Sequence, residues 1–115
     1  MTGYFRSIRE AATFSPDKAA KVDLFLGGQL FAGLNCFEPK QSQKVHVHAG
    51  ADKFYLIVTG KARMIVGTET RDVGEGTLIW APADVPHGVI EALERTVMLV
   101  AVAPPPGRVG PLRSG

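Results

Sequence analysis

The sequence predicts an all-β fold, an antiparallel sandwich or barrel. Its apolar and β-branched runs are short, and turn residues such as Gly27-Gly28 and Thr59-Gly60 separate them at regular intervals. Only residues 7–12, SIREAA, have the composition of a helical turn. Many short strands with almost no helix are typical of sheets that pack on each other or close into a barrel.

Each expected strand is a run of apolar and β-branched residues, and glycine, proline or acidic residues bound most of these runs. The expected strands cover residues 4–8, 22–26, 30–37, 44–48, 53–59, 61–66, 70–73, 77–81, 87–92 and 96–103.

The length and composition predict one domain. A chain of 115 residues with 45% hydrophobic residues can bury one real core, but it is too small for two. We expect a single domain over residues 1–103, with its core in residues 20–103. Residues 104–115 are rich in proline and glycine, so they are expected to leave the barrel as a mobile or partner-bound tail.

The charge and the apolar pattern argue against several partners. The formal net charge is +2 and the lysines and arginines are scattered, so no basic stripe favours nucleic acid. The sequence shows neither a secretory leader nor an apolar run long enough for a membrane span. A single cysteine, Cys36, excludes an internal disulfide and fits the reducing cytoplasm, where we expect it to be a small buried hydrophobe.

Two of the three histidines, His46 and His48, are separated by one residue. In a strand, residues i and i+2 point to the same face, so both imidazoles project together. A neutral imidazole is a common ligand of transition metals, and a further ligand from another strand would complete a site. Taken alone, this pair is also compatible with two exposed histidines on a strand that has one face in solvent.

The surrounding residues resemble the first motif of the cupin family, G(x)5HxH(x)3–4E(x)6G. In the stretch HVHAGADKFYLIVTG, four residues separate His48 from Lys53, and six residues separate Lys53 from Gly60. Lys40 stands where the motif has its first glycine. Lys53 stands where the motif has its glutamate ligand.

The second cupin motif, G(x)5PxG(x)2H(x)3N, is similar to GTLIWAPADVPHGVIE. Gly76, Pro82 and His87 match it, whereas Asp84 replaces a glycine and Glu91 replaces the final asparagine. The turn at Asp84 suits an aspartate, which tolerates left-handed backbone angles.

The resemblance implies a small single-domain cupin, a conserved barrel of the double-stranded β-helix or jelly-roll type. It further implies one divalent transition metal (iron, manganese, zinc, nickel or copper) held by His46, His48 and His87, and a small-molecule ligand or substrate. Cupins of this size are commonly homodimers. The apolar stretch LFLGGQLFAGL, residues 24–34, independently favours a homodimer with N-terminal strands in the interface.

The register of the next strand decides which residue joins the histidines. An ammonium has no lone pair, so Lys53 is expected near the metal but outside its coordination shell. Asp52 satisfies the shorter version of the motif, but strand alternation turns it outward unless a bulge intervenes. We expect Lys53 to face inward and Asp52 outward.

Three residues are candidates for catalysis: Lys53, Tyr55 and Glu91. Lys53 is a candidate anchor or proton carrier for an acidic substrate. Tyr55 shares its parity, and it either hydrogen-bonds a ligand or fills the core. Glu91 shares parity with His87, and four roles are open to it. It could accept a hydrogen bond from the free N–H of a ligand histidine, pair with Lys53 or act as a base. It could also be a solvated residue at the rim.

The residues leave three classes of function open. A three-histidine site with open coordination positions favours a metal-dependent enzyme, oxygenase- or isomerase-like, acting on a small carbonyl or carboxylate compound. The alternative is a non-catalytic metal-dependent binding module for a small molecule or sugar. A sensory domain of a regulator is disfavoured because the sequence holds no helix-turn-helix segment.

Overall fold

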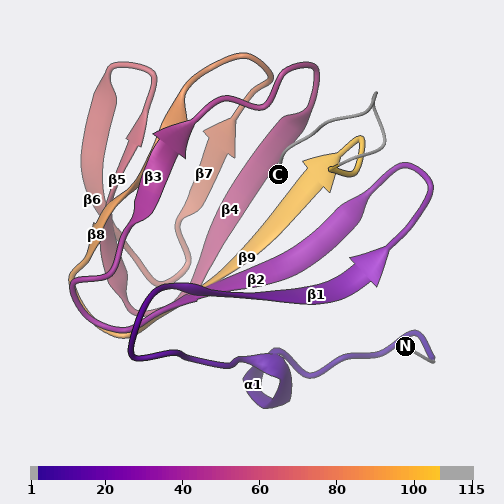
Figure 1. Ribbon diagram of the computed structural model, residues 1–115, viewed down its shortest axis with the longest axis horizontal. Coiled ribbons are helices and arrows are strands. Elements are labelled where there is room, and N and C mark those ends of the chain that lie inside the picture. Colours follow the sequence, from indigo (N-terminus) through magenta and orange to yellow (C-terminus); the bar gives the residue numbers. More distant parts are fainter. Residues whose placement is uncertain (1–2, 107–115) are drawn as a thin grey trace.

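Two antiparallel sheets face each other in the computed structural model, which describes residues 3–106 (Figure 1). The first sheet has the strand order β1-β2-β9-β4-β7, and the second has the order β3-β8-β5-β6. This all-β architecture confirms the expected class. The elements are α1 (Ile8–Ala11), β1 (Ala20–Leu26), β2 (Phe31–Phe37), β3 (Gln43–His46), β4 (Asp52–Thr59), β5 (Lys61–Val66), β6 (Glu69–Gly74), β7 (Leu78–Ala81), β8 (His87–Ala92) and β9 (Thr96–Ala103).

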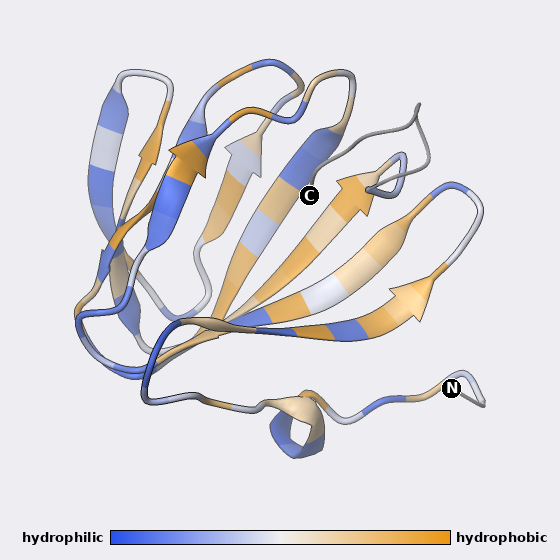
Figure 2. Cartoon of the chain, viewed as in Figure 1, coloured by the Kyte–Doolittle hydropathy of each residue, from blue (hydrophilic) through white to orange (hydrophobic). Residues whose placement is uncertain are grey.

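The main core lies between the sheets. Apolar residues run along β9 at the centre of the five-stranded sheet, whereas β6 at the edge of the other sheet is mostly hydrophilic (Figure 2). Along β4 the buried positions alternate, so Tyr55 and Ile57 enter the core. Met64 of β5 and Met98 of β9 pack in the same cluster, which joins the two sheets.

A second apolar cluster lies apart from the main core and explains the position of the helix. Leu24, Leu34 and Val97 form its buried part, and Ile8 of α1 packs against them. The side chain of Ser7 caps the helix by accepting a hydrogen bond from the backbone N–H of Glu10. A short helical turn at SIREAA is therefore confirmed.

The strand expected at residues 4–8 is wrong. No strand precedes β1 within the described residues, and Tyr4 and Phe5 are 91% and 92% exposed. Their aromatic side chains fit a strand by propensity, but this segment has no neighbouring strand with which to pair. The other expected strands agree with observed ones within a few residues. β3 ends at His46, two residues before the predicted end.

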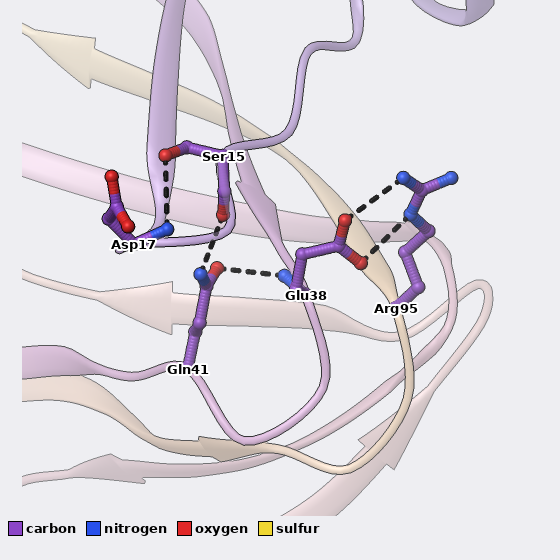
Figure 3. Close-up of polar contacts among 5 residues, drawn as sticks. All are labelled: Ser15, Asp17, Glu38, Gln41 and Arg95. Carbon is purple, nitrogen blue, oxygen red and sulfur yellow. Dashed lines mark hydrogen bonds and ion pairs between the residues drawn. The ribbon is translucent and has the colours of Figure 1, made fainter.

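Polar contacts fasten the N-terminal segment to the loops at one end of the barrel (Figure 3). The Gln41 amide nitrogen donates to the backbone oxygen of Ser15 at 2.7 Å, and its oxygen accepts from the Glu38 N–H at 2.8 Å. Arg95 makes two hydrogen bonds to the Glu38 carboxylate and lies 3.8 Å from the centre of the Phe14 ring. These contacts hold the turn between β2 and β3 in place.

Two residues at glycine positions of the cupin motifs have left-handed backbone angles. Lys40 has φ 78° and Asp84 has φ 70°. The chain therefore keeps the backbone geometry of both turns without the glycine, at a cost in strain. The Asp84 carboxylate accepts a hydrogen bond from the Gly50 N–H at 3.3 Å, which offsets part of this strain.

The residues after β9 stay against the barrel at first. Pro105 is fully buried and Pro106 lines a cavity. The expectation that the chain leaves the barrel from residue 104 onwards therefore does not hold for these residues. Residues 107–115 lie outside the described part, so the expectation for them stays a prediction. In the described part of the chain, no helix has the length and apolar character needed to cross a membrane.

Candidate metal centre

The three histidine rings meet at one end of the barrel. His46 is the last residue of β3 and His87 is the first residue of β8, and the two are direct partners in the antiparallel pair. The centres of the His46 and His48 rings are 4.8 Å apart, and the His87 ring lies 4.5 and 5.3 Å from them. The expected meeting of these three rings is confirmed.

The ring nitrogens have defined roles. His46 Nδ1 lies 2.8 Å from the backbone oxygen of Lys44, and His87 Nδ1 lies 2.9 Å from that of Val85. A carbonyl oxygen can only accept, so both Nδ1 atoms carry the hydrogen and both Nε2 atoms keep a lone pair. This is the tautomer that a metal-ligating histidine needs.

The group fits a metal ion. Candidate ligand atoms from His46, His48 and His87 all lie within 4.8 Å of one another. His87 is fully buried, and its Nε2 has no hydrogen-bond partner among the described residues. A buried polar atom without a partner costs free energy, and a metal ion would satisfy it.

The electrostatics keep the imidazoles neutral. Burial lowers the pKa of His46, and it lowers the pKa values of His48 and His87 to about 4. The nearby positive charge of Lys53 contributes to each of these lowered pKa values. All three rings are therefore unprotonated at neutral pH, which is the form that binds metal.

Lys53 faces inward and Asp52 faces outward, as the sequence predicted. Lys53 is only 5% exposed, and its Nζ lies 4.5 Å from the centre of the Tyr55 ring. Burial lowers the pKa of Lys53 to about 8, and the charge of Lys21 adds to the effect. Asp52 is exposed, and its carboxylate accepts a hydrogen bond from the Ala83 N–H at 2.9 Å.

Tyr55 fills the core and holds another side chain. It is fully buried, and its hydroxyl donates to Gln43 Oε1 at 2.8 Å. Burial raises the pKa of this hydroxyl above its ordinary value, so Tyr55 stays protonated. Because Gln43 uses its oxygen on Tyr55, its amide nitrogen is left as a donor near the histidines.

Glu91 does not share the inward face, contrary to the sequence expectation. A register shift between Arg63 and Met64 of β5 places Glu91 opposite Arg63, while Val89 lies opposite Met64. The extra residue, Ile90, breaks the alternation that the sequence argument assumed. Glu91 therefore lies beside an outward-facing arginine, away from the histidines.

A cavity of about 310 Å³ lies beside the histidines. Its polar wall includes Asn35 and Gln43, whose orientation the sequence did not settle. Asn35 lies on β2 outside both motifs, and Gln43 is one of the unspecified positions of the first motif. A slightly larger cavity, of about 370 Å³, opens along β5, β6 and β7 and contains no histidine. The residues around the histidine cavity are Lys21, Asp23, Leu26, Phe31, Asn35, Gln43, His46, His48, Lys53, Val100, Val102 and Pro106.

The fold and the site together define a class: a small antiparallel jelly-roll barrel with three histidines grouped at its mouth. The chain belongs to the cupin family, because the family model described as the cupin domain matches residues 33–103. This membership covers both histidine motifs and confirms the resemblance seen in the sequence.

Solved structures support the same assignment. The chain is 36% identical to the protein TT1209 from Thermus thermophilus, with a TM-score of 0.84 over 89% of this chain and 98% of the other. An RmlC-like cupin from Desulfovibrio desulfuricans has 22% identity and a TM-score of 0.80, covering 90% of this chain and 99% of the other. The second likeness shows the fold alone.

One curated relative also matches. An uncharacterised protein of Streptomyces coelicolor is 38% identical over 64 residues, which are 56% of this chain. The match spans 58% of the length of that relative, so it adds no information about activity.

Proposed function

We propose that this protein is a metal-dependent enzyme, oxygenase- or isomerase-like, that acts on a small carbonyl or carboxylate compound. The observation that carries the proposal is the unpartnered, buried Nε2 of His87 beside two other neutral imidazoles. His46, His48 and His87 would hold one divalent ion: iron, manganese, zinc, nickel or copper. Such an ion supplies Lewis acidity, which polarises a carbonyl or water oxygen.

The other residues of the site have distinct parts in this proposal. Lys53 presents a positive charge to the cavity and would attract an acidic substrate. Tyr55 is a positioning residue, because its hydroxyl fixes the Gln43 amide rather than reaching the cavity. Glu91 has no part, because it lies opposite Arg63 on the outer side of the sheet.

The protein is further proposed to work as a homodimer in the cytoplasm. Tyr4, Leu26 and Leu30 line a shallow hollow beside β1, an edge strand of the five-stranded sheet. Two copies of an edge strand can pair about a two-fold axis and cover such apolar side chains. The buried, free Cys36 is compatible with a reducing compartment.

Metal content tests the site. Protein made without a histidine tag should contain one transition-metal ion per chain by mass spectrometry. His48→Ala should lose stoichiometric metal, because the remaining pair of imidazoles holds the ion far more weakly. Asp52→Ala is the matched control and should keep the metal, as should Lys53→Ala. Loss of metal in Asp52→Ala with full metal in His48→Ala would contradict the proposed ligand set.

Turnover tests the chemistry. The iron- or manganese-loaded protein should convert one member of a panel of small oxo acids and hydroxy acids, followed by nuclear magnetic resonance, and a chelator should stop it. Saturable binding without any product would instead favour the non-catalytic binding module.

Light scattering tests the assembly. The wild type should have the mass of a dimer at tens of micromolar. Tyr4→Glu, which places a charge in the lining of the hollow, should give the monomer. Ile90→Glu is the control, because Ile90 is an exposed apolar residue on the other sheet. A monomeric wild type would contradict the homodimer.

A further inference from the structure

Two residues of the five-stranded sheet, Asn35 and Lys53, carry hydrogen-bond donors at buried positions. Asn35 of β2 is 4% exposed, and its Nδ2 has no hydrogen-bond partner among the described residues. Lys53 of β4 is buried, and residues 3–106 offer its ammonium no carboxylate within 4.0 Å. An unpaired buried amide donor is costly, and an aromatic ring compensates a buried ammonium only in part, so an anionic acceptor would stabilise both groups.

Both donors line the cavity that holds the histidines. β2 and β4 lie on either side of β9 in the same sheet, and Asn35 and Lys53 both border the cavity of about 310 Å³. His46 and His48 border it from the segment that pairs with β8 in the other sheet. The cavity therefore has donors on one side and imidazoles on another.

The charges around the cavity favour an anion over a cation. Lys21, the register partner of Asn35 on β1, adds a second positive charge to the lining. Asp23 is the one acidic residue of the described lining, and it is exposed on the same edge strand. No carboxylate among the described residues faces the buried Lys53 ammonium across the cavity within salt-bridge distance.

We propose that Lys53 and Asn35 form an anchor for the carboxylate group of the substrate. The ammonium supplies a point charge and the amide supplies N–H donors, which together match a carboxylate oxygen pair. A small acid held in this way directs its other end toward the histidines. The assignment of that end rests on the proposed function, whereas the anchor itself does not need a metal.

The test uses metal-free protein, so that a metal cannot bind the probe. Malonate is the probe, and malonamide, its neutral analogue, is the matched control ligand. Malonate should shift the side-chain amide signal of Asn35 in nuclear magnetic resonance, and malonamide should not. Lys53→Met should weaken malonate binding by about tenfold, and Asn35→Leu by about threefold.

Two further variants keep the result interpretable. Lys18→Met removes an exposed lysine far from the cavity lining and should bind malonate like the wild type. Asn35→Asp should weaken binding more than Asn35→Leu, because it adds a repelling carboxylate. If Lys53→Met does not fold, Lys53→Gln takes its place with the same expected direction.

Clear outcomes separate the anchor from the metal site. Equal malonate affinity in wild type, Lys53→Met and Asn35→Leu would overturn the anchor, even if the protein binds metal fully. Malonate binding that depends on both residues would support the anchor, even if metal analysis contradicts the three-histidine site. Equal binding of malonamide and malonate would also overturn it.

Discussion

The two walls of the site carry opposite chemistry. The four-stranded sheet and the segment after it contribute neutral imidazoles, which offer lone pairs. The five-stranded sheet contributes the Lys53 ammonium and the Asn35 amide, whose N–H groups can donate to an anion. The imidazoles, called the histidine wall below, suit a metal ion. Lys53 and Asn35, called the donor wall below, suit a carboxylate. A carboxylate ligand held by the donor wall would account for a lysine at the position where the family motif has a glutamate.

The two walls also titrate on opposite sides of neutrality. The pKa values of His48 and His87 are lowered to about 4, and that of Lys53 is lowered to about 8. Near pH 7 the imidazoles are neutral while the lysine is mostly charged. The two titrations are weakly coupled, because the charge of Lys53 adds to the effect of burial on the histidine pKa values.

The largest effect should come from disturbing the packing of the histidine wall. A Cβ at Gly88 would lie 2.9 Å from the backbone oxygen of Gln43 and 2.9 Å from the Cα of Val45. Gly88→Ala should therefore push β3 away from β8, lower the free energy of unfolding by about 3 kcal/mol and reduce metal content. Gly28→Ala is the control, because its Cβ would meet nothing within 4 Å. Urea unfolding and mass spectrometry measure both effects, and unchanged stability in Gly88→Ala would contradict this packing.

The contribution of Lys53 to stability should be seen at alkaline pH. The folded pKa of Lys53 lies below its ordinary 10.5. The unfolded chain therefore binds more protons between pH 8 and 10.5, and metal-free protein should gain stability as pH rises through this window. Lys53→Met should abolish about 2 kcal/mol of this gain. Urea unfolding at several pH values measures this change. If the free energy of unfolding rises equally with pH in the wild type and in Lys53→Met above pH 8, Lys53 is not desolvated.

The contribution of the histidines to stability should be seen at acid pH. Because His87 has a folded pKa near 4 against 6.5 when unperturbed, the unfolded chain binds more protons between these values. Metal-free protein should lose stability as pH falls from 6.5 to 4, with His87 contributing on the order of 2 kcal/mol. His87→Gln should flatten this loss, whereas Lys53→Met should reduce it only slightly, because burial is a larger cause of the lowered His87 pKa than the charge of Lys53. Urea unfolding between pH 4 and 6.5 measures the loss. If Lys53→Met changes it as much as His87→Gln does, the assignment of the loss to His87 is contradicted.

The smallest effect should come from the turn that joins the walls. Lys40 lies between β2 and β3 with φ 78°, a left-handed conformation that glycine adopts without strain. Lys40→Gly should raise the free energy of unfolding by about 1 kcal/mol. Asp84→Gly should gain less, because it also loses the hydrogen bond to the Gly50 N–H. Both are measured by urea unfolding, and destabilisation by Lys40→Gly would mean that its side chain matters more than its backbone.

The sequence predicted the features that depend on local periodicity. The i, i+2 spacing placed His46 and His48 together, and alternation along β4 placed Lys53 inside and Asp52 outside. The prediction for β4 succeeds because a strand with one buried face allows a single register. His48 lies two residues beyond the end of β3, so the segment after the strand, and not strand alternation, places its ring beside His46. The match of His87 to the second motif supplied the long-range contact that periodicity alone cannot supply.

The errors and omissions arise where tertiary structure overrides local pattern. A bulge at Ile90 turned Glu91 outward, and no residue type in that stretch signals the extra residue. Tyr4 and Phe5 have strand propensity but no partner strand. The orientation of Asn35 depends on how two sheets face each other, which is a property of the whole fold rather than of its own strand.

The hydrogen bonds that orient His46 and His87 go to main-chain oxygens two residues earlier in each case. Each acceptor is a main-chain oxygen, so replacing the side chain of Lys44 or Val85 does not remove the acceptor. The orientation of these two rings therefore depends little on neighbouring side chains, whereas Lys53, Asn35 and Lys21 act through their own side chains. Substitutions on the five-stranded sheet can therefore change the ligand preference of such a scaffold without rebuilding the histidine group that could hold an ion.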